Sequence, residues 1–193
     1  PKILWEKKAV TFLRQNSLPD IPGAWKLMLL GDGSPTRHLQ LLTKKETKIK
    51  LIGMEIEQIS IKDAPEEIKE LKTPLIRRQV WIENDNITLA WAESWWNIEQ
   101  VRLNLTNTKD PIWKNLTKDR SELFREVDAI SIVNSPWLNK QFKSQGPFWS
   151  RNYRFFRNKK PLTIIREVFN PAIEKWLGNG EIERFINLYS SSA

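Results

Sequence analysis

Residues 75–96, LIRRQVWIENDNITLAWAESWW, are the stretch that decides the fold. Two runs rich in β-branched and aromatic residues flank the polar segment 83–86, which is the sequence form of an antiparallel hairpin. Because successive side chains of a strand point to opposite faces, Arg78 shares a face with Val80 and Ile82. If that face meets the core, the guanidinium needs an anion, either a protein carboxylate or a ligand, since burying it unpaired is costly. The alternative is an edge arginine whose charged end reaches water.

The composition excludes several classes of site. A chain of 193 residues suits one domain, and a hydrophobic content of 40% with ten tryptophans is enough for a substantial core. The lack of cysteine excludes disulfides, thiolate metal sites and cysteine nucleophiles, and the single histidine, His38, argues against a zinc site. No apolar segment reaches the length of a transmembrane helix and no secretory signal opens the sequence. We therefore expect a cytoplasmic protein with no membrane span and no metal.

The net charge of +8 favours an anionic partner, which could be nucleic acid, membrane phosphate or a small polycarboxylate. The 31 basic residues are nevertheless interspersed with 23 acidic ones, and no run of five or six basic residues occurs. The densest basic region, residues 151–160, alternates arginines with aromatic residues. Such a segment is typical of a platform for single-stranded nucleic acid or, more commonly, of a strand with one apolar and one solvated face.

Periodicity and capping signals predict the other elements. The predicted helical segments are 1–16 (a short amphipathic helix or docking arm), 24–30, 34–42, 64–71, a helix that starts at 110–113, 120–130 and 181–189. The predicted strands are 48–61, with a bulge near Gly53, and a second pair at 149–157 and 161–169. Strands and helices do not alternate regularly, so we expect the α+β class, with a central antiparallel sheet covered by helices. We assign residues 1–193 to one domain, with an N-terminal arm over 1–23 and a C-terminal helical extension over 172–193.

Two of the helix starts are candidates for ligand contacts. Ser34 is a good N-cap and Pro35 suits the first helical position, so the free amides of that turn could receive a carboxylate. An ordinary capped helix has the same pattern. Asp110 and Pro111 repeat the signal. His38 is more commonly a surface or packing residue than a catalyst, because it has no partner nearby in the sequence.

The last predicted strand carries one charge on each face. Glu167 shares a face with Ile165, whereas Arg166 points the other way, and alternation alone does not decide which of the two charges is inward. An inward Glu167 would be desolvated, which raises the pKa of a carboxyl group and could make it a proton donor. Alternatively, Glu167 pairs with a core arginine such as Arg78 or Arg154.

Several segments, in their order and spacing over residues 25–171, resemble a known family. They are LLGDGSPTR at 29–37, RQVWI at 78–82, AESWW at 92–96, PIWKNL at 111–116, WSRNYRFFR at 149–157 and PLTIIREVFNP at 161–171. No single motif is specific, but together they resemble the chorismate pyruvate-lyases, which split chorismate into 4-hydroxybenzoate and pyruvate. The longer N-terminal and C-terminal parts are more similar to the cyanobacterial and plastid branch than to the shorter enzymes of ubiquinone synthesis.

The resemblance implies roles for particular residues. The buried arginine of the family, which pairs with the ring carboxylate, falls on Arg78. The active-site glutamate, near the ring oxygen, falls on Glu167. Main-chain contacts from two flap-like helical segments fall on Pro35 or Thr36 and on Ile112.

The sequence departs from the family pattern at three positions. Pro35 has no N–H, so an amide contact there has to come from a neighbouring residue. Trp113 replaces a small residue and could narrow the flap. Glu93 stands where the shorter enzymes have a second basic residue, so we expect the second carboxylate to bind Arg151 or Arg154 instead.

The implied function is that of a carbon–oxygen lyase that forms 4-hydroxybenzoate and pyruvate for quinone synthesis of the plastoquinone type. It needs neither metal nor cofactor, and its helical flaps close over a buried ligand pocket. The alternative is a non-catalytic module of the same fold that binds a small aromatic carboxylate. For partners, we expect a small-molecule substrate, chorismate, and its product, no nucleic acid, and a monomer or weak homo-oligomer.

Overall fold

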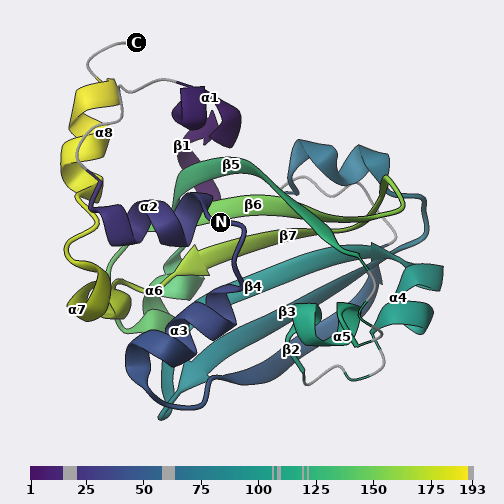
Figure 1. The fold of residues 1–193 in the computed structure, drawn as a ribbon. Helices are drawn as coiled ribbons and strands as arrows, with labels where there is room; N and C mark the ends of the chain where they lie inside the picture. Colours follow the sequence, from purple (N-terminus) through teal and green to yellow (C-terminus); the bar gives the residue numbers. More distant parts are fainter. Residues whose placement is uncertain are drawn as a thin grey trace.

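One antiparallel sheet of seven strands, in the order β1-β5-β6-β7-β4-β3-β2, runs through the part of the chain that the structure describes (Figure 1). This computed structural model describes residues 1–14, 21–57, 64–105, 107, 110–118, 120 and 122–190. The strands are β1 (Lys2–Lys8), β2 (Lys48–Glu57), β3 (Leu75–Asn84), β4 (Ile87–Asn97), β5 (Phe124–Asn134), β6 (Phe148–Arg157) and β7 (Lys160–Phe169). The predicted α+β class with a central antiparallel sheet is confirmed.

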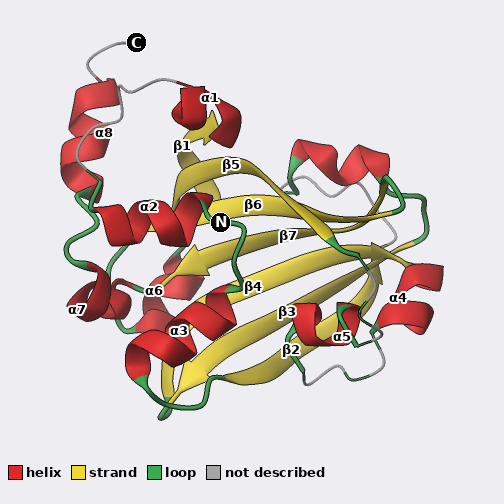
Figure 2. Cartoon of the chain, in the orientation of Figure 1, coloured by secondary structure: helices red, strands yellow, loops and turns green. Residues whose placement is uncertain are grey.

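Short helices cover both faces of the sheet (Figure 2). They are α1 (Ala9–Arg14), α2 (Gly23–Leu30), α3 (Pro35–Thr43), the 3-10 helix η1 (Glu66–Glu70), α4 (Ile98–Asn104), α5 (Ile112–Leu116), α6 (Pro136–Phe142), the 3-10 helix η2 (Pro171–Ile173), α7 (Glu174–Leu177) and α8 (Ile182–Ser190). Helices α2 and α3 pack on the face that carries Val80 and Ile82. Helix α6 packs against Trp91, and η1 against Trp95, on the opposite face.

The central hairpin forms as predicted, with a tighter turn. Strands β3 and β4 pair from Leu75 to Asn84, so the strands extend into the polar segment and only Asp85 and Asn86 form the turn. Both turn residues have positive φ, 48° and 63°, as a two-residue type I′ turn requires. Asp and Asn tolerate this conformation better than most residues, which is why the sequence turns here.

The second predicted strand pair, β6 and β7, also forms and turns at Asn158 and Lys159. It joins the first hairpin because β7 pairs with β4 along its length. This pairing puts Ala92 directly beside Glu167, although the two residues are far apart in the chain.

The predicted helix over residues 120–130 is wrong, because Phe124 already begins strand β5, which is paired on both sides. A register shift between Val127 and Ala129 puts an extra residue into the strand. Such a bulge interrupts the period of two, so that Phe124, Val127 and Ile130 imitate helical spacing. The bulge predicted near Gly53 is confirmed by the register shift between β2 and β3.

Other predicted boundaries also change. Residues 2–8 of the predicted N-terminal helix or arm form edge strand β1, and only Ala9–Arg14 is helical. Helices α4 and α6 occupy segments for which no helix is predicted. Residues 15–16 and 58–61 of predicted elements lie outside the described residues.

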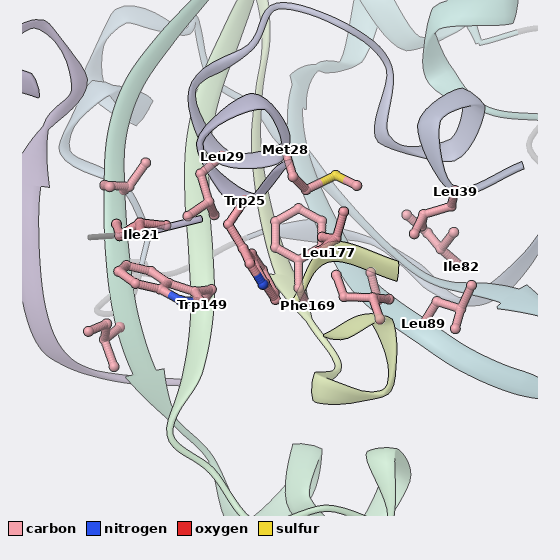
Figure 3. Close-up of a cluster of buried hydrophobic side chains, with 14 of the residues drawn as sticks. Ile21, Trp25, Met28, Leu29, Leu39, Ile82, Leu89, Trp149, Phe169 and Leu177 are labelled. Atoms are coloured by element: carbon pink, nitrogen blue, oxygen red, sulfur yellow. The ribbon is translucent and has the colours of Figure 1, made fainter. Parts of the chain in front are cut away.

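The largest core cluster includes Phe12 and Phe185, from helices near both ends of the described chain. Figure 3 shows its centre, where Trp25 lies beside Phe169 and Trp149. Trp25 of α2, only 1% exposed, packs edge-on against Phe169 of β7 and donates from its indole nitrogen to the Gly178 carbonyl at 2.7 Å. Phe185 of α8 joins the same cluster through Trp149, at 5.3 Å between ring centroids. None of the described helices is long and apolar enough to cross a membrane.

Candidate functional site

A cavity of about 40 Å³ lies between the sheet and the first turns of α3 and α5. It is lined by Ser34, Pro35, Thr36, Ile49, Arg78, Val80, Ile82, Ala92, Glu93, Ser94, Pro111, Ile112, Trp113, Arg125, Tyr153, Phe155, Ile165 and Glu167. An empty space that admits benzene measures about 150 Å³. The cavity in this conformation therefore has room for a few waters, and the flap segments or side chains have to move to admit an aromatic ring.

Strand register brings the lining residues together. Two neighbouring rows cross the same face of the sheet and run Arg78–Ser94–Ile165–Tyr153 and Val80–Ala92–Glu167–Arg151. Directly paired residues lie about 5 Å apart, so each row is a line of touching side chains. The small side chains of Ala92 and Ser94 lie in the middle of these rows and leave space above β4. The large neighbours Trp91 and Trp95 point to the opposite face.

Arg78 lies at the β3 side of the cavity with its side chain turned inward, as Val80 and Ile82 are. It is only 2% exposed, so its charged end does not reach bulk water. Its Nη2 donates to the Asp110 carbonyl at 3.4 Å, next to α5. Burial lowers the pKa of Arg78 to about 10, which leaves it cationic at neutral pH and desolvated.

Glu167 is the inward charge of β7, and it is held by two partners. Its Oε2 accepts from Arg151 Nε at 2.8 Å, and its Oε1 accepts from the Tyr153 hydroxyl at 2.8 Å. Burial and the charge of Glu167 raise the pKa of Tyr153 far above its usual range, so this phenol remains a donor. The alternative that Glu167 pairs with a core arginine is thus realised, and the arginine is Arg151. A carboxylate has about four acceptor positions, so Glu167 can accept further hydrogen bonds from a ligand.

Arg151 stands behind Glu167 and does not line the cavity. Its guanidinium is fully buried and donates from Nη1 to the carbonyls of Met28 and Gly31, at 2.8 and 2.9 Å. The same side chain therefore orients the Glu167 carboxylate and anchors the end of α2 to the sheet.

Arg154 is not brought to the site. It follows Tyr153 by one residue, so it points to the opposite face, where it pairs with Asp128 at 2.6 Å and with Glu70 of η1 at 2.7 Å. The Glu93 carboxylate is also engaged away from the cavity, by Arg77 at 2.9 Å and by Arg166 at 2.6 Å.

The two flap segments touch each other over the cavity. Trp113 Nε1 in α5 donates to Thr36 Oγ1 in α3 at 3.1 Å, and the Ser34 hydroxyl lies 2.8 Å from the same oxygen. Pro35, Thr36 and Ile112 all line the cavity. The predicted helix start at 110–111 is shifted by one residue, because Pro111 is the N-cap of α5.

Sequence reasoning missed Arg125 and Tyr153 as lining residues. Arg125 was assigned to a helix, whereas on β5 it pairs across the ladder with Phe155 and reaches the cavity. Its guanidinium carbon lies 4.7 Å from the ring centroid of Tyr153 and 4.5 Å from that of Phe155. The basic and aromatic alternation at 151–160 was the available signal for these cation–π contacts.

His38 lines an adjoining surface depression of about 470 Å³ and not the cavity. Partial burial, then the charges of Arg151 and Arg125, lower the pKa of His38, so its imidazole is neutral near pH 7. Its ring packs on the backbone of Gly33, where an added Cβ would lie 2.3 Å from Nε2. The residues described contain no group of three or more acidic or histidine side chains placed to hold a metal ion.

Solved structures share this fold at low sequence identity. The effector domain of PhnF from Mycobacterium smegmatis matches 75% of this chain and 92% of its own length, with a TM-score of 0.55 and 9% identity. The C-terminal domain of the histidine utilization repressor from Pseudomonas syringae matches 66% of this chain and 93% of its own length, with a TM-score of 0.50 and 14% identity. At these identities the likeness concerns the fold alone.

Sequence relatives are much closer. The uncharacterised protein ycf21 of Cyanophora paradoxa is 34% identical over 174 residues, 90% of each chain. The uncharacterised ycf21 of Porphyra purpurea is 34% identical over 179 residues, covering 89% of this chain and 95% of its own. A family model described as chorismate pyruvate-lyase, Rv2949c-like, matches residues 29–177, which include both flap segments and all the cavity-lining strands. The chain therefore belongs to the Rv2949c-like chorismate pyruvate-lyase family.

Proposed function

We propose that the protein is a chorismate pyruvate-lyase that supplies 4-hydroxybenzoate for quinone synthesis of the plastoquinone type. The observation that carries the proposal is that a buried, desolvated arginine and a buried glutamate face one cavity from β3 and β7. Only β4 separates these strands, and Glu167 lies one row along the sheet from Arg78. Strand spacing therefore puts the Cα atoms of Arg78 and Glu167 roughly 12 Å apart. Two long side chains that converge over this span suit a ring with a carboxylate at one end and a hydroxyl at the other.

The predicted residues other than Arg154 have roles in this arrangement. Arg78 holds the ring carboxylate with parallel N–H donors, and its desolvation means that it gains much from an anion. Glu167 accepts the hydrogen bond of the ring hydroxyl and is oriented by Arg151. Thr36 and Ile112 supply the flap contacts, and Pro35, without an N–H, supplies apolar wall.

The reaction needs little from the protein. The ether bond at ring carbon 3 breaks and its electron pair leaves with the enolpyruvate, while carbon 4 loses a proton and the ring becomes aromatic. The enolpyruvate gains a proton on its methylene carbon and becomes pyruvate, so the protons balance and no oxidant or reductant is consumed. Orientation and charge complementarity are therefore the main contributions of the site. Glu167 assists by holding the hydroxyl on the carbon that loses the proton.

The flaps have to open for this reaction. A cavity of about 40 Å³ does not hold a six-membered ring, so the contact between Trp113 and Thr36 has to break or shift as substrate enters. Closure afterwards would exclude water and complete the contacts to the substrate.

The test is to incubate purified protein with chorismate and to quantify both products without added metal. Equal amounts of 4-hydroxybenzoate and pyruvate are expected, with loss in Arg78→Ala and Glu167→Gln. Arg102→Ala, a change of an exposed arginine on α4, is the matched control and should retain activity. Near-normal turnover in Arg78→Ala would contradict the assignment.

The second candidate is a module that binds a small aromatic carboxylate without turnover. The fold shared with the effector domain of PhnF supports it, as does a cavity closed by a flap hydrogen bond. A protein that forms no product, but whose tryptophan fluorescence responds to 4-hydroxybenzoate through Arg78, would favour this candidate.

A further inference from the structure

Arg125 differs from Arg151 and Arg166 in having no carboxylate beside it. Arg151 pairs with Glu167, and Arg166 pairs with Glu93. In the described part of the chain, no Asp or Glu oxygen lies within 4.0 Å of the Arg125 guanidinium. Arg125 thus brings a positive charge to the cavity wall that none of the described residues neutralises by an ion pair.

The described hydrogen bonds of Arg125 leave one edge of its guanidinium without an acceptor. Nη1 donates to the Gly33 carbonyl, and the guanidinium makes cation–π contacts with Tyr153 and Phe155. Nε is buried and has no hydrogen-bond acceptor among the described residues. The Nε and Nη2 hydrogens of a guanidinium point the same way and match the two oxygens of a carboxylate. The two cation–π contacts and the hydrogen bond to Gly33 restrain the guanidinium, which favours a preformed anion site.

The position of Arg125 suits a second acidic group on the ligand bound by Arg78. Arg125 lines both the cavity and the adjoining depression, so it stands at the boundary between them. Arg78 and Arg125 lie on β3 and β5, which are four strand spacings, or about 19 Å, apart across the sheet. Both side chains extend from these strands to the same cavity, so a ligand with one carboxylate on Arg78 can direct a second carboxylate toward Arg125.

We infer that Arg125 binds the second carboxylate of the substrate and makes the site prefer a dicarboxylate over a monocarboxylate. The identity of the ligand rests on the proposed lyase function, but the preference itself does not require turnover. Arg151 and Arg154, the two arginines predicted for this role, are already paired with Glu167 and Asp128.

The test uses two unreactive ligands that differ only in the second acid. They are 3-(carboxymethoxy)-4-hydroxybenzoate and 4-hydroxy-3-methoxybenzoate, and their affinities for the whole chain are measured by tryptophan fluorescence. Arg125→Gln should lower the affinity for the dicarboxylate by about 10- to 100-fold, as expected when a charged hydrogen-bond pair is lost. The affinity for the methoxy compound should fall by less than about threefold. Arg78→Ala should weaken both, because both carry the ring carboxylate.

A second variant and a control separate recognition from folding. Arg125→Lys keeps the charge but lacks the two parallel donors. Its affinity for the dicarboxylate should therefore fall by about 3- to 10-fold, and its affinity for the methoxy compound should not change. Arg37→Gln, an exposed change in the same depression, should alter neither affinity. Equal losses for both ligands in the Arg125 variants, or no loss for either, would overturn the inference.

These outcomes are independent of the lyase assay. A wild-type protein that leaves chorismate intact, but prefers the dicarboxylate through Arg125, refutes the lyase and keeps the inference. If the wild type forms both products in equal amounts, but the Arg125 variants keep the same ligand preference, the lyase function stands and the inference about Arg125 is refuted.

Discussion

Replacing Arg151 by methionine tests whether one buried arginine holds both the Glu167 carboxylate and the end of α2. The side chain is fully buried and donates to Glu167 at 2.8 Å and to the carbonyls of Met28 and Gly31 at 2.8 and 2.9 Å. Methionine fills much of the same volume without a donor or a charge. The variant therefore leaves Glu167 as a buried anion without its cation, and two carbonyls without this donor.

The expected loss is large. Removing one partner of a buried ion pair costs about 3–5 kcal/mol, because the other charge remains buried. An unsatisfied buried carbonyl adds about 1–3 kcal/mol, part of which relaxation of the loop after α2 recovers. We expect the free energy of unfolding to fall by about 4–6 kcal/mol in total. For a chain of 193 residues this lowers Tm by about 10–20 °C.

The assay is urea unfolding of the wild type, Arg151→Met, Glu167→Gln and the double variant, with Arg102→Met as an exposed control. Because Glu167→Gln removes the uncompensated charge, the double variant should be about 2–3 kcal/mol more stable than Arg151→Met alone. The control should change stability by less than about 0.5 kcal/mol. If Arg151→Met costs less than about 1.5 kcal/mol, or if the double variant is no more stable than Arg151→Met, the ion pair does not hold this site together.

Three further predictions concern the flap, the histidine and the core. Trp113→Phe removes the donor to Thr36 Oγ1, so 4-hydroxybenzoate should dissociate about 3- to 10-fold faster in stopped-flow fluorescence; an unchanged rate would mean that this hydrogen bond does not restrain the flap. The pKa of His38 is lowered in the folded state, so the unfolded chain binds more protons and the free energy of unfolding should fall as the pH drops through 6.5. Urea unfolding between pH 5 and 8 should show a shallower fall for His38→Gln than for the wild type, and the same pH dependence in both proteins would refute the shift. Phe169→Ala opens the core beneath Trp25 and should cost about 3–5 kcal/mol in the same assay, and a cost under about 1 kcal/mol would contradict the observed packing.

Much of the architecture could be predicted from local patterns. The alternation around Arg78 placed it on the face of Val80 and Ile82, and the structure buries it there. The turn residues Asp85 and Asn86 marked the central hairpin because both tolerate positive φ. Such signals depend on neighbours within a few residues, so the sequence carries them directly.

The errors arose where a local pattern was ambiguous. The bulge between Val127 and Ala129 disrupts the alternation of β5, so a strand resembled a helix and Arg125 was not considered for the site. Strand β6 is largely buried on both faces, so its pattern could not decide between Arg151 and Arg154.

The sequence by itself determined the class of the protein, the two hairpins, the face that Arg78 shares with Val80 and Ile82, and the starts of the two flap segments. Only the tertiary structure decided which side chains meet. Ala92 and Ser94 lie beneath the cavity, with Glu167 beside Ala92, because β4 pairs with β7 in one register, and that pairing joins segments about 70 residues apart. The same long-range packing supplies Arg151 as the partner of Glu167 and brings Arg125 from β5 to the cavity wall. Alternation and capping are local properties of the chain, whereas register between distant strands is chosen by the burial of the whole sheet.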